Sequence, residues 1–471
     1  MATHPSSTAD APAPQLKRAL GASDLMWLCV VAIANLNIVP VIAANGPTTT
    51  WLWVVALVLF FLPQGIAVIE LSQQMPGEGG IYLWAKDKFG DFHGFLCGWC
   101  YWTTNMFYIP TLLFYLAGTV TYAGGPASAR LAENPLFFFV LTTGLLWLAC
   151  IANIFGIGVG KWVCNIGGYG TLVASIVLIV LGVITVSRHG MSIPAGGFAI
   201  QRIDWPIFSS FGVICFGLVG LELGPVMGDE IKDPKRTVPL GIFWGGVLSG
   251  LLYMAATMSL LISVPPQDVK VVQGVLQAVD KMAGGIGAGW VLAPLAILLG
   301  IAITGSTSAW VSGSARIIFV SGIDRYLPRI FGKVHPKYHS PHIALIAMAA
   351  LSSCLVVLSF VGGAGVKEAY QTLLDLSVVL QMISYLYLFG ALAVVAFGTG
   401  PTFYRRARLR FAAVFGLLTT LAGGIVAFVP SRQVESIFRF EVKMVGTCVV
   451  FLALAAGLFR YYSSRRPATG I

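Results

Sequence analysis

Charged residues are scarce in this chain. Of its 471 residues, only 10% are Asp, Glu, Lys or Arg, whereas 57% are hydrophobic. A water-soluble domain carries roughly a quarter of its residues as charged side chains. The shortage of charge therefore excludes a soluble globular protein, and it indicates that lipid covers most of the surface.

The sequence also lacks a signal peptide and any recognisable catalytic set. The first 23 residues contain no apolar core of the kind that signal peptides need, and we expect them to form a cytosolic arm. No HExxH motif, aspartate pair or Ser/His set lies within the apolar runs. Cys97 and Cys100 have the spacing of a redox or metal pair, but no His or acidic ligand is near them. We therefore expect a protein that is not an enzyme and has no cofactor, metal or disulfide.

Long apolar runs are abundant. Twelve of them can each cross about 30 Å of hydrocarbon, which takes about 20 helical residues. They do not alternate between apolar and polar residues as the strands of a membrane barrel do, so the sequence predicts an all-α membrane protein with 12 transmembrane helices. The runs are 24–44, 51–72, 93–123, 136–156, 163–187, 207–227, 238–264, 288–318, 342–362, 372–397, 410–429 and 444–461.

The net charge of +10 follows this topology. With both termini in the cytosol, 20 of the 29 Lys and Arg residues lie on the cytosolic side, as the positive-inside rule requires. We therefore expect a multi-pass protein of the cell membrane with cytosolic N- and C-termini. The expected partners are the lipid bilayer and a small molecule, not nucleic acid, and the sequence leaves a homodimer open.

Two of the runs contain residues that interrupt a helix. Gly and Pro both weaken a helix, and the backbone groups that a break frees cannot face lipid. Breaks at matching places in two halves of a chain are typical of an inverted-repeat transporter that binds its substrate at the membrane midplane. The alternative is that these small residues only allow close helix packing. The interrupting residues are Asn35-Leu36-Asn37 and Pro40 in the first run, and Gly217, Gly220, Gly224 and Pro225 in the sixth.

Few ionisable residues lie inside the runs. Glu222 lies beside the second break, Asp375 enters the tenth run, and Glu70 and Arg316 lie near helix ends. Such groups are costly in a membrane and suggest function. A low-dielectric site disfavours a charged carboxylate, so we predict that Glu222 titrates during transport and makes the activity depend on pH.

Several segments match motifs of one family, and together they cover nearly the whole chain. They are Met75–Lys86, Phe89–Trp99, Gly220-Leu-Glu222, Gly228–Pro239, Ser314-Ala-Arg316, Asp324–Pro328 and Lys333–Pro336. They resemble the amino acid–polyamine–organocation (APC) superfamily, and the bacterial glutamate/GABA antiporters look most similar. The first helix of those antiporters, as here, lacks Gly-x-Gly and has a Pro shortly after the break.

The resemblance implies a five-plus-five inverted repeat that works by alternating access. Its ten-helix core would cover residues 24–397, in halves 24–187 and 207–397. Two further helices would follow within 398–461, and then a cytosolic tail, 462–471.

The resemblance also assigns roles to single residues. Phe216 and Trp310 match aromatic residues at the substrate site, Tyr101 matches a third-helix tyrosine, and Glu222 matches a carboxylate tied to pH response or coupling. The full set of expected substrate-binding residues is Asn35, Leu36, Asn37, Tyr101, Phe216, Gly217, Gly220 and Trp310.

The function expected from these features is secondary transport of amino acids or related amines, by antiport. A proton-coupled amino-acid or polyamine importer is the alternative, and a channel or a ligand sensor that transports nothing is a remoter one. No Lys or Arg lies mid-membrane to pair with a second carboxylate, which favours a substrate with a neutral or cationic side chain.

Overall fold

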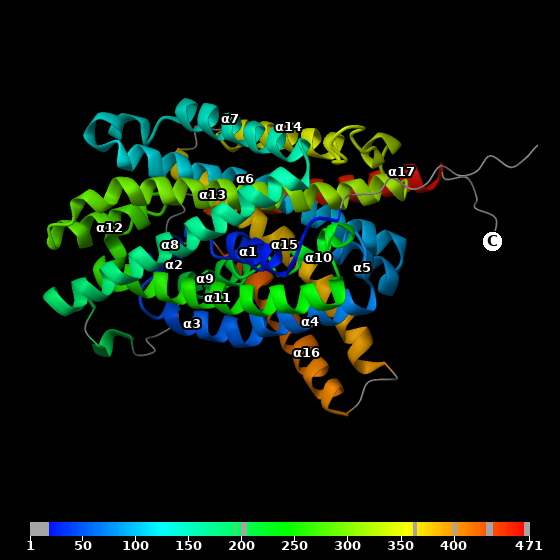
Figure 1. Ribbon diagram of the computed structural model, residues 1–471, viewed down its shortest axis with the longest axis horizontal. Helices are drawn as coiled ribbons and strands as arrows, with labels where there is room; N and C mark the ends of the chain where they lie inside the picture. The colour runs from blue at the N-terminus through cyan, green and yellow to red at the C-terminus, as the bar shows by residue number, and fades with distance from the viewer. Residues whose placement is uncertain are drawn as a thin grey trace, which may run out of the picture.

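The chain folds into a bundle of helices that run mostly along its long axis (Figure 1). The computed structural model describes residues 18–193, 195–198, 205–360, 365–398, 403–429 and 437–465. Within these ranges all regular elements are helical, apart from two isolated β-bridges. The short helices α5 (Ile81–Phe89) and α12 (Gly274–Gly285) lie at opposite ends of the bundle. These ends are called the α5 end and the α12 end below.

Ten described helices are long and apolar enough to cross a membrane. Together with the two broken helices below, they make up the twelve predicted spans. The unbroken spans are α3 (Thr49–Ala56) continued by η1 (Leu57–Phe61) and α4 (Leu62–Gln74), α6 (Asp91–Ala123), α7 (Pro135–Ile154), α8 (Ile157–His189), α11 (Pro234–Ser263), α13 (Leu292–Ile323), α14 (His342–Ser359), α15 (Val366–Phe397), α16 (Phe403–Val426) and α17 (Ile437–Ser463).

The first and sixth spans are each divided into two helices, as the sequence predicts. The first consists of α1 (Ala22–Ile33) and α2 (Ile38–Ala43), and the sixth of α9 (Trp205–Gly217) and α10 (Leu223–Val226). Four residues separate the first pair and five the second, 34–37 and 218–222.

The same proline placement contributes to both breaks. Pro40 and Pro225 are each the third residue of the second half-helix. In a continuous helix a proline ring clashes with the carbonyl four residues earlier and removes a hydrogen bond; those carbonyls belong to Leu36 and Leu221. At the second break Gly220 also has φ +136°, a conformation that side chains rarely allow.

The two breaks contact each other. A Cβ atom on Gly220 would lie 2.9 Å from Ile33 Cγ1, and one on Gly217 would lie 3.3 Å from Ile38 Cδ1. The two glycines therefore allow the sixth span to approach the first at the level where both lose regular helical structure.

The sequence analysis did not predict α5 and α12 as helices, because neither forms a long apolar run. Each buries only one face; in α12 that face includes Val275, Val279 and Met282. Shorter helical turns lie in the connections: η2 (Gly125–Leu131), η3 (Ala195–Phe198), η4 (Gly228–Glu230), η5 (Pro266–Asp268), η6 (Gly289–Val291) and η7 (Arg329–Gly332).

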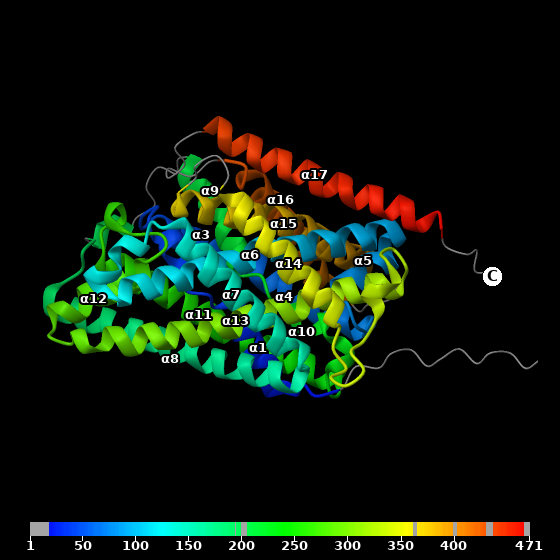
Figure 2. The same ribbon diagram turned by 90° about the horizontal axis from the view of Figure 1, so that it is seen from above.

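Of the two C-terminal spans, α16 packs against α9 of the broken sixth span, whereas α17 lies farther from the breaks. Figure 2 shows α17 along one outer edge of the bundle. Most of the predicted arm, residues 1–17, and the end of the predicted tail, 466–471, lie outside the described residues. The proposed division of the chain into core, extra helices and tail stays a prediction.

Candidate functional site

Side chains from three neighbouring spans cover carbonyl groups at the first break. The Trp310 indole N–H donates to Ala32 O at 3.2 Å, the Tyr253 hydroxyl to Asn35 O at 2.8 Å, and the Tyr370 hydroxyl to Asn37 O at 3.1 Å. Backbone groups that leave a helix need such partners in a membrane. In this conformation, aromatic side chains from α13, α11 and α15 therefore pair with the backbone carbonyls of Ala32, Asn35 and Asn37.

The two asparagines of the first break differ in their hydrogen bonding. Asn35 Nδ2 donates to Ala32 O at 2.5 Å, so this side chain helps to end α1. The Asn37 side chain is 1% exposed, and neither its nitrogen nor its oxygen has a hydrogen-bond partner among the described residues. Leu36 between them is buried at 5% exposure. Of the three, Asn37 alone has a buried carboxamide without a hydrogen bond of good geometry, and the Tyr370 hydroxyl, which donates to Asn37 O, also lies near this carboxamide.

Aromatic residues enclose the same region. Tyr108 of α6 makes edge-to-face contacts with Phe216, at 4.8 Å between ring centroids, and with Trp310, at 5.8 Å. The Tyr101 ring lies 6.4 Å from that of Trp310. The structure therefore brings the three predicted aromatic residues together, and Tyr108 joins them.

Glu222 lies at the end of the second break, fully buried. Its carboxylate accepts hydrogen bonds from the Tyr385 hydroxyl at 2.5 Å, the Tyr101 hydroxyl at 3.1 Å, Gln64 Nε2 at 3.2 Å and the Gly220 backbone N–H at 3.1 Å. All four donors are neutral. Tyr101, which the sequence analysis assigned to the substrate, thus contacts both the predicted coupling carboxylate and the aromatic cluster.

The α5 end is closed by a buried ion cluster. Arg316 donates to both carboxylate oxygens of Glu230 at 2.9 Å, and its Nε lies 3.7 Å from Glu78 Oε1. All three side chains are at most 5% exposed. Burial and the neighbouring Glu230 raise the pKa of Glu78 well above its usual range, although Arg316 opposes the shift.

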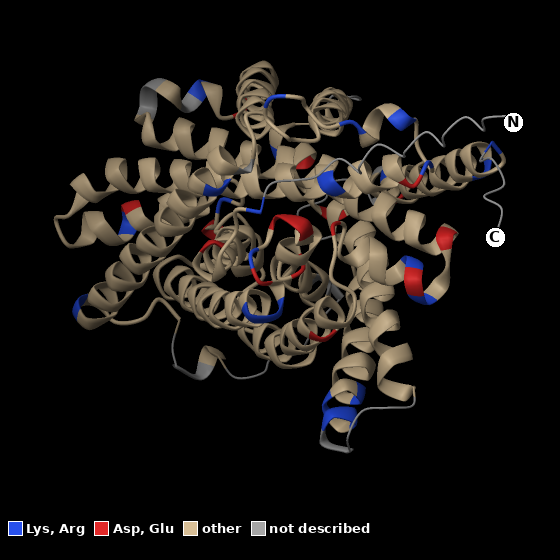
Figure 3. Cartoon of the chain, turned by 45° about the vertical axis from the view of Figure 1, so that its right-hand side comes forward, with Lys and Arg blue, Asp and Glu red and all other residues tan. Residues whose placement is uncertain are grey.

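Further contacts tie the loops together at this end. Backbone bridges join Leu20 to Ile231 and Glu78 to Met227. Asp324 binds Lys86 Nζ and the Tyr82 hydroxyl, each at 2.6 Å. Figure 3 shows charged residues gathered in and around the connecting segments, whereas most of the helical ribbon carries none.

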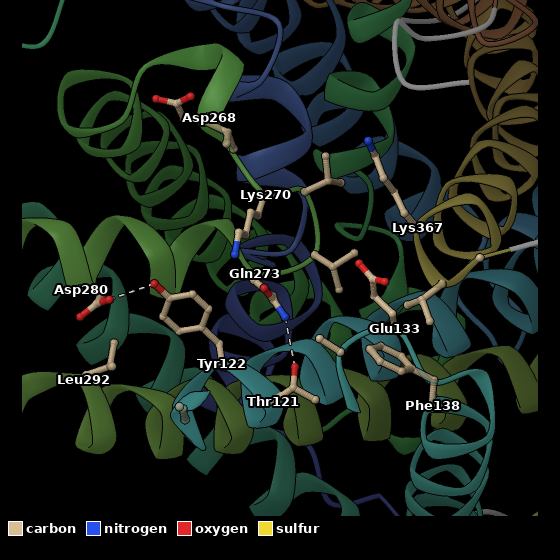
Figure 4. A pocket seen from close by; sticks show the side chains of 18 of the residues that line it. Thr121, Tyr122, Glu133, Phe138, Asp268, Lys270, Gln273, Asp280, Leu292 and Lys367 are labelled. Atoms are coloured by element: carbon tan, nitrogen blue, oxygen red, sulfur yellow. Dashed lines mark hydrogen bonds between the residues drawn. The ribbon is translucent and has the colours of Figure 1, made fainter. Parts of the chain in front are cut away.

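The α12 end contains a hollow of about 1030 Å³ between α6, the segment before α12 and the start of α15 (Figure 4). Across it, Gln273 Nε2 donates to Thr121 Oγ1 at 3.1 Å, and the Tyr122 hydroxyl donates to Asp280 at 3.0 Å. Charged side chains of both signs line the hollow, so it can admit polar solutes from this end.

The sequence analysis missed several residues of the site. The sequence did not distinguish four tyrosines from the many other aromatic residues of the apolar runs, and it did not single out Gln64. The tyrosines are Tyr108, Tyr253, Tyr370 and Tyr385. The available signal was a polar group in mid-span, since such a group must find a partner inside the protein. No group of three or more potential metal ligands occurs in the described part of the chain.

Comparison with known proteins places this architecture in a family. The sequence profile of the amino acid permease family matches residues 20–454. An uncharacterised transporter of Legionella pneumophila is 28% identical over 455 residues, which cover 93% of this chain and 95% of that transporter.

Two further relatives, whose names state an activity, are more distant from this chain. A probable agmatine/putrescine antiporter of Lactococcus lactis is 23% identical over 80% of this chain and 78% of its own length. A glutamate/gamma-aminobutyrate antiporter of the same species is 23% identical over 70% of this chain and 67% of its own length.

A solved structure shows the same fold. The crystal structure of MhsT in complex with L-phenylalanine superimposes with a TM-score of 0.63 and 14% sequence identity, and the match covers 88% of this chain and all of that one. The profile match over nearly the whole sequence shows that the chain belongs to the amino acid permease family, as a multi-pass membrane transporter and not an enzyme.

Proposed function

We propose that this permease moves an amino acid or a related amine by alternating access, with the substrate bound between the two breaks. The observation that carries the proposal is the Asn37 side chain, buried in the first break without a hydrogen-bond partner among the described residues. Leaving both ends of a buried carboxamide unpaired costs free energy. A polar substrate beside Asn37 would remove that cost.

The surrounding groups suit the head of an amino acid. The hydroxyls of Tyr253 and Tyr370 donate hydrogen bonds to carbonyls of the first break in this conformation. If these side chains rotate away, the same carbonyls can accept hydrogen bonds from an ammonium group. Phe216, Tyr108 and Trp310 would cover the apolar part of the substrate. Asn37 would donate to the carboxylate.

The two ends of the bundle supply the gates. Ion pairs and backbone bridges close the α5 end, whereas the α12 end is hollowed between α6, the segment before α12 and the start of α15. We assign the α5 end to the cytosol, because segments that carry Lys86, Lys88 and Lys232 lie there and cytosolic loops are rich in Lys and Arg.

Antiport is the mode that we favour, since two relatives are named as antiporters. Glu222 offers coupling through protonation, because only neutral donors hold its carboxylate. The second candidate is a proton-coupled importer, which the same carboxylate would serve. An imposed proton gradient would drive accumulation by such an importer and not by a pure exchanger.

The test is counterflow in proteoliposomes. Vesicles that contain the full chain are loaded with one unlabelled amino acid or diamine, and uptake of the labelled compound is followed at acid and neutral pH. A carrier gives saturable uptake that depends on the internal compound, whereas a channel gives none. Ligand-dependent thermal stabilisation without uptake would instead indicate a sensor.

Asn37→Ala tests the site itself. The variant loses the unpartnered carboxamide but keeps the backbone carbonyl that Tyr370 contacts, so we expect kcat/KM for counterflow to fall by about tenfold with little loss of thermal stability. The matched control is Asn45→Ala at the end of α2, where the side chain bonds only to Val41 O. Equal rates in Asn37→Ala and wild type would remove Asn37 from the site.

A further inference from the structure

Helices α6 and α15 run in opposite directions and touch beside Glu222. Helix α6 follows α5 and ends at the hollow of the α12 end, where α15 begins. The Ser384 hydroxyl donates to Cys97 O at 3.1 Å, which fixes the register of the two helices. From that contact toward the α12 end, Gln381 lies about one turn along α15, and Asn105 two turns along α6.

From the general direction of side chains in helices, we expect Gln381 and Asn105 to point toward each other along the bundle axis. Long side chains in a helix point back toward its N-terminus, so Gln381 leans toward the α12 end and Asn105 toward the α5 end. Tyr385 and Tyr101 lie one turn from Gln381 and Asn105 on the same helices, and both donate to Glu222. The two amides therefore lie directly on the α12 side of Glu222.

These amides have unused hydrogen-bonding atoms. Gln381 is 0% exposed, and neither its nitrogen nor its oxygen has a partner among the described residues. Asn105 Oδ1 and Gln64 Oε1 are likewise buried and unpartnered there. Few buried polar groups in folded proteins lack a partner, and those that do require an explanation.

The amide nitrogens of Asn105 and Gln64 already donate hydrogen bonds, and this shows which of their atoms are unused. Asn105 Nδ2 donates to Tyr101 O at 2.9 Å, and Gln64 Nε2 donates to Glu222. A carbonyl or carboxylate can only accept, so the unused atoms of Asn105 and Gln64 must be oxygens. With Gln381 they offer three acceptors and one donor, next to a carboxylate.

We infer that Asn105, Gln381 and Gln64, together called the amide tier, form the subsite for the far end of the substrate and select a group rich in N–H donors, such as a second ammonium or an amide. The inference rests on the proposed function, in which the α-amino acid head lies at the breaks. An ammonium brings three donors and no acceptor, which suits a site with more acceptors than donors. A side-chain carboxylate would face acceptors and Glu222.

Lysine and norleucine test the amide tier, because lysine adds one ammonium to the norleucine chain. Proteoliposomes with the full chain are assayed by counterflow of each labelled compound. For wild type we expect kcat/KM to favour lysine by about tenfold or more. In Gln381→Leu the preference should fall to about threefold or less, because kcat/KM for lysine falls more than kcat/KM for norleucine.

Gln381→Glu should change the preference for lysine in the opposite direction from Gln381→Leu. It therefore keeps the test decisive if Gln381→Leu does not fold. It adds a carboxylate to the tier, so the preference for lysine should rise and any transport of glutamate should weaken. The matched control is Gln73→Leu, the same substitution at an exposed position near the end of α4; its lysine preference should equal that of wild type.

The outcomes separate this inference from the proposed function. If wild type shows no saturable counterflow with any amino acid or diamine of the panel, the proposed function fails. If wild type exchanges solutes but shows no preference for lysine over norleucine, or keeps the preference in Gln381→Leu or Gln381→Glu unchanged, the amide tier is not a selective subsite and the proposed function stands.

Discussion

Two buried acidic clusters lie along the same bundle, and they are stabilised in different ways. Glu230 at the α5 end pairs with Arg316 through two hydrogen bonds of 2.9 Å. Glu222 near the middle of the bundle is held by two tyrosines, a glutamine and a backbone N–H. Glu230 thus has a buried cationic partner, whereas the groups around Glu222 are neutral and include two hydroxyls that can donate or accept.

This contrast indicates that the cluster around Arg316 closes the α5 end, whereas Glu222 couples protonation to transport. At the α5 end, charge pairing links three segments and must be disrupted for that end to open. Around Glu222, a change of protonation rearranges only hydrogen bonds among neutral groups. This difference is why we place the coupling at Glu222 and the lock at Arg316.

The largest loss of thermal stability is expected from Glu230→Gln. Removing one partner of a buried ion pair leaves an uncompensated charge and costs about 3–5 kcal/mol. The variant should therefore show a strongly reduced apparent melting temperature in detergent. The control is Glu368→Gln, which breaks the part-exposed pair with Lys443 and should cost at most about 1 kcal/mol. Similar losses in the two variants would contradict the assignment of a lock.

Glu222→Gln tests whether protonation of Glu222 couples to transport. The amide cannot change its protonation state, so the ratio of counterflow rates at acid and neutral pH should fall to about one. Because the four donors of wild type are neutral, no charge is left unpaired and the melting temperature should change far less than in Glu230→Gln. A variant with the wild-type rate and pH profile would show that Glu222 has no coupling role.

The smallest change in thermal stability is expected from Glu78→Gln, within the cluster at the α5 end. Because burial raises the pKa of Glu78 in the folded protein, ionisation of this group opposes folding. Its contribution to stability is fully present below the unfolded pKa of about 4.3 and is lost as the pH rises toward the folded value. Glu78→Gln should remove that loss, so the melting temperature at neutral pH should equal or slightly exceed that of wild type.

The pH dependence provides the check. Between about pH 4 and neutral pH, wild type should lose stability relative to Glu78→Gln. A strong loss of stability in Glu78→Gln at neutral pH, comparable to that in Glu230→Gln, would mean that Arg316 needs both carboxylates charged.

Much of the fold was predictable because lipid imposes simple rules on a sequence. Hydrophobic length identifies the spans. The clusters of Asn, Gly and Pro at 35–40 and 217–225 indicate the two breaks, whereas the lone Pro110 and Pro239 lie inside the continuous helices α6 and α11. The short helices α5 and α12 could not be recognised by the same rule, since each contacts the bundle through one face only.

The site was predictable only in part. The resemblance assigned Phe216, Trp310 and Glu222 to the site, and these roles stay predictions. Gln64, Tyr370 and Tyr385 became visible only through their partners. Those partners are far apart in sequence: Gln64 and Tyr385 meet at Glu222 from two other spans.

The sequence by itself determined that this chain spans a membrane, where two of its helices break, and that an acidic residue lies beside the second break. These properties depend on local composition, because lipid excludes charge and several residues that weaken a helix fall close together at each break. Only the tertiary structure decided which groups surround Glu222, which donors cover the opened carbonyls, and which amides remain unpaired. Those choices depend on how α6, α11, α13 and α15 pack against the breaks, and contacts between distant segments leave no local pattern in the chain.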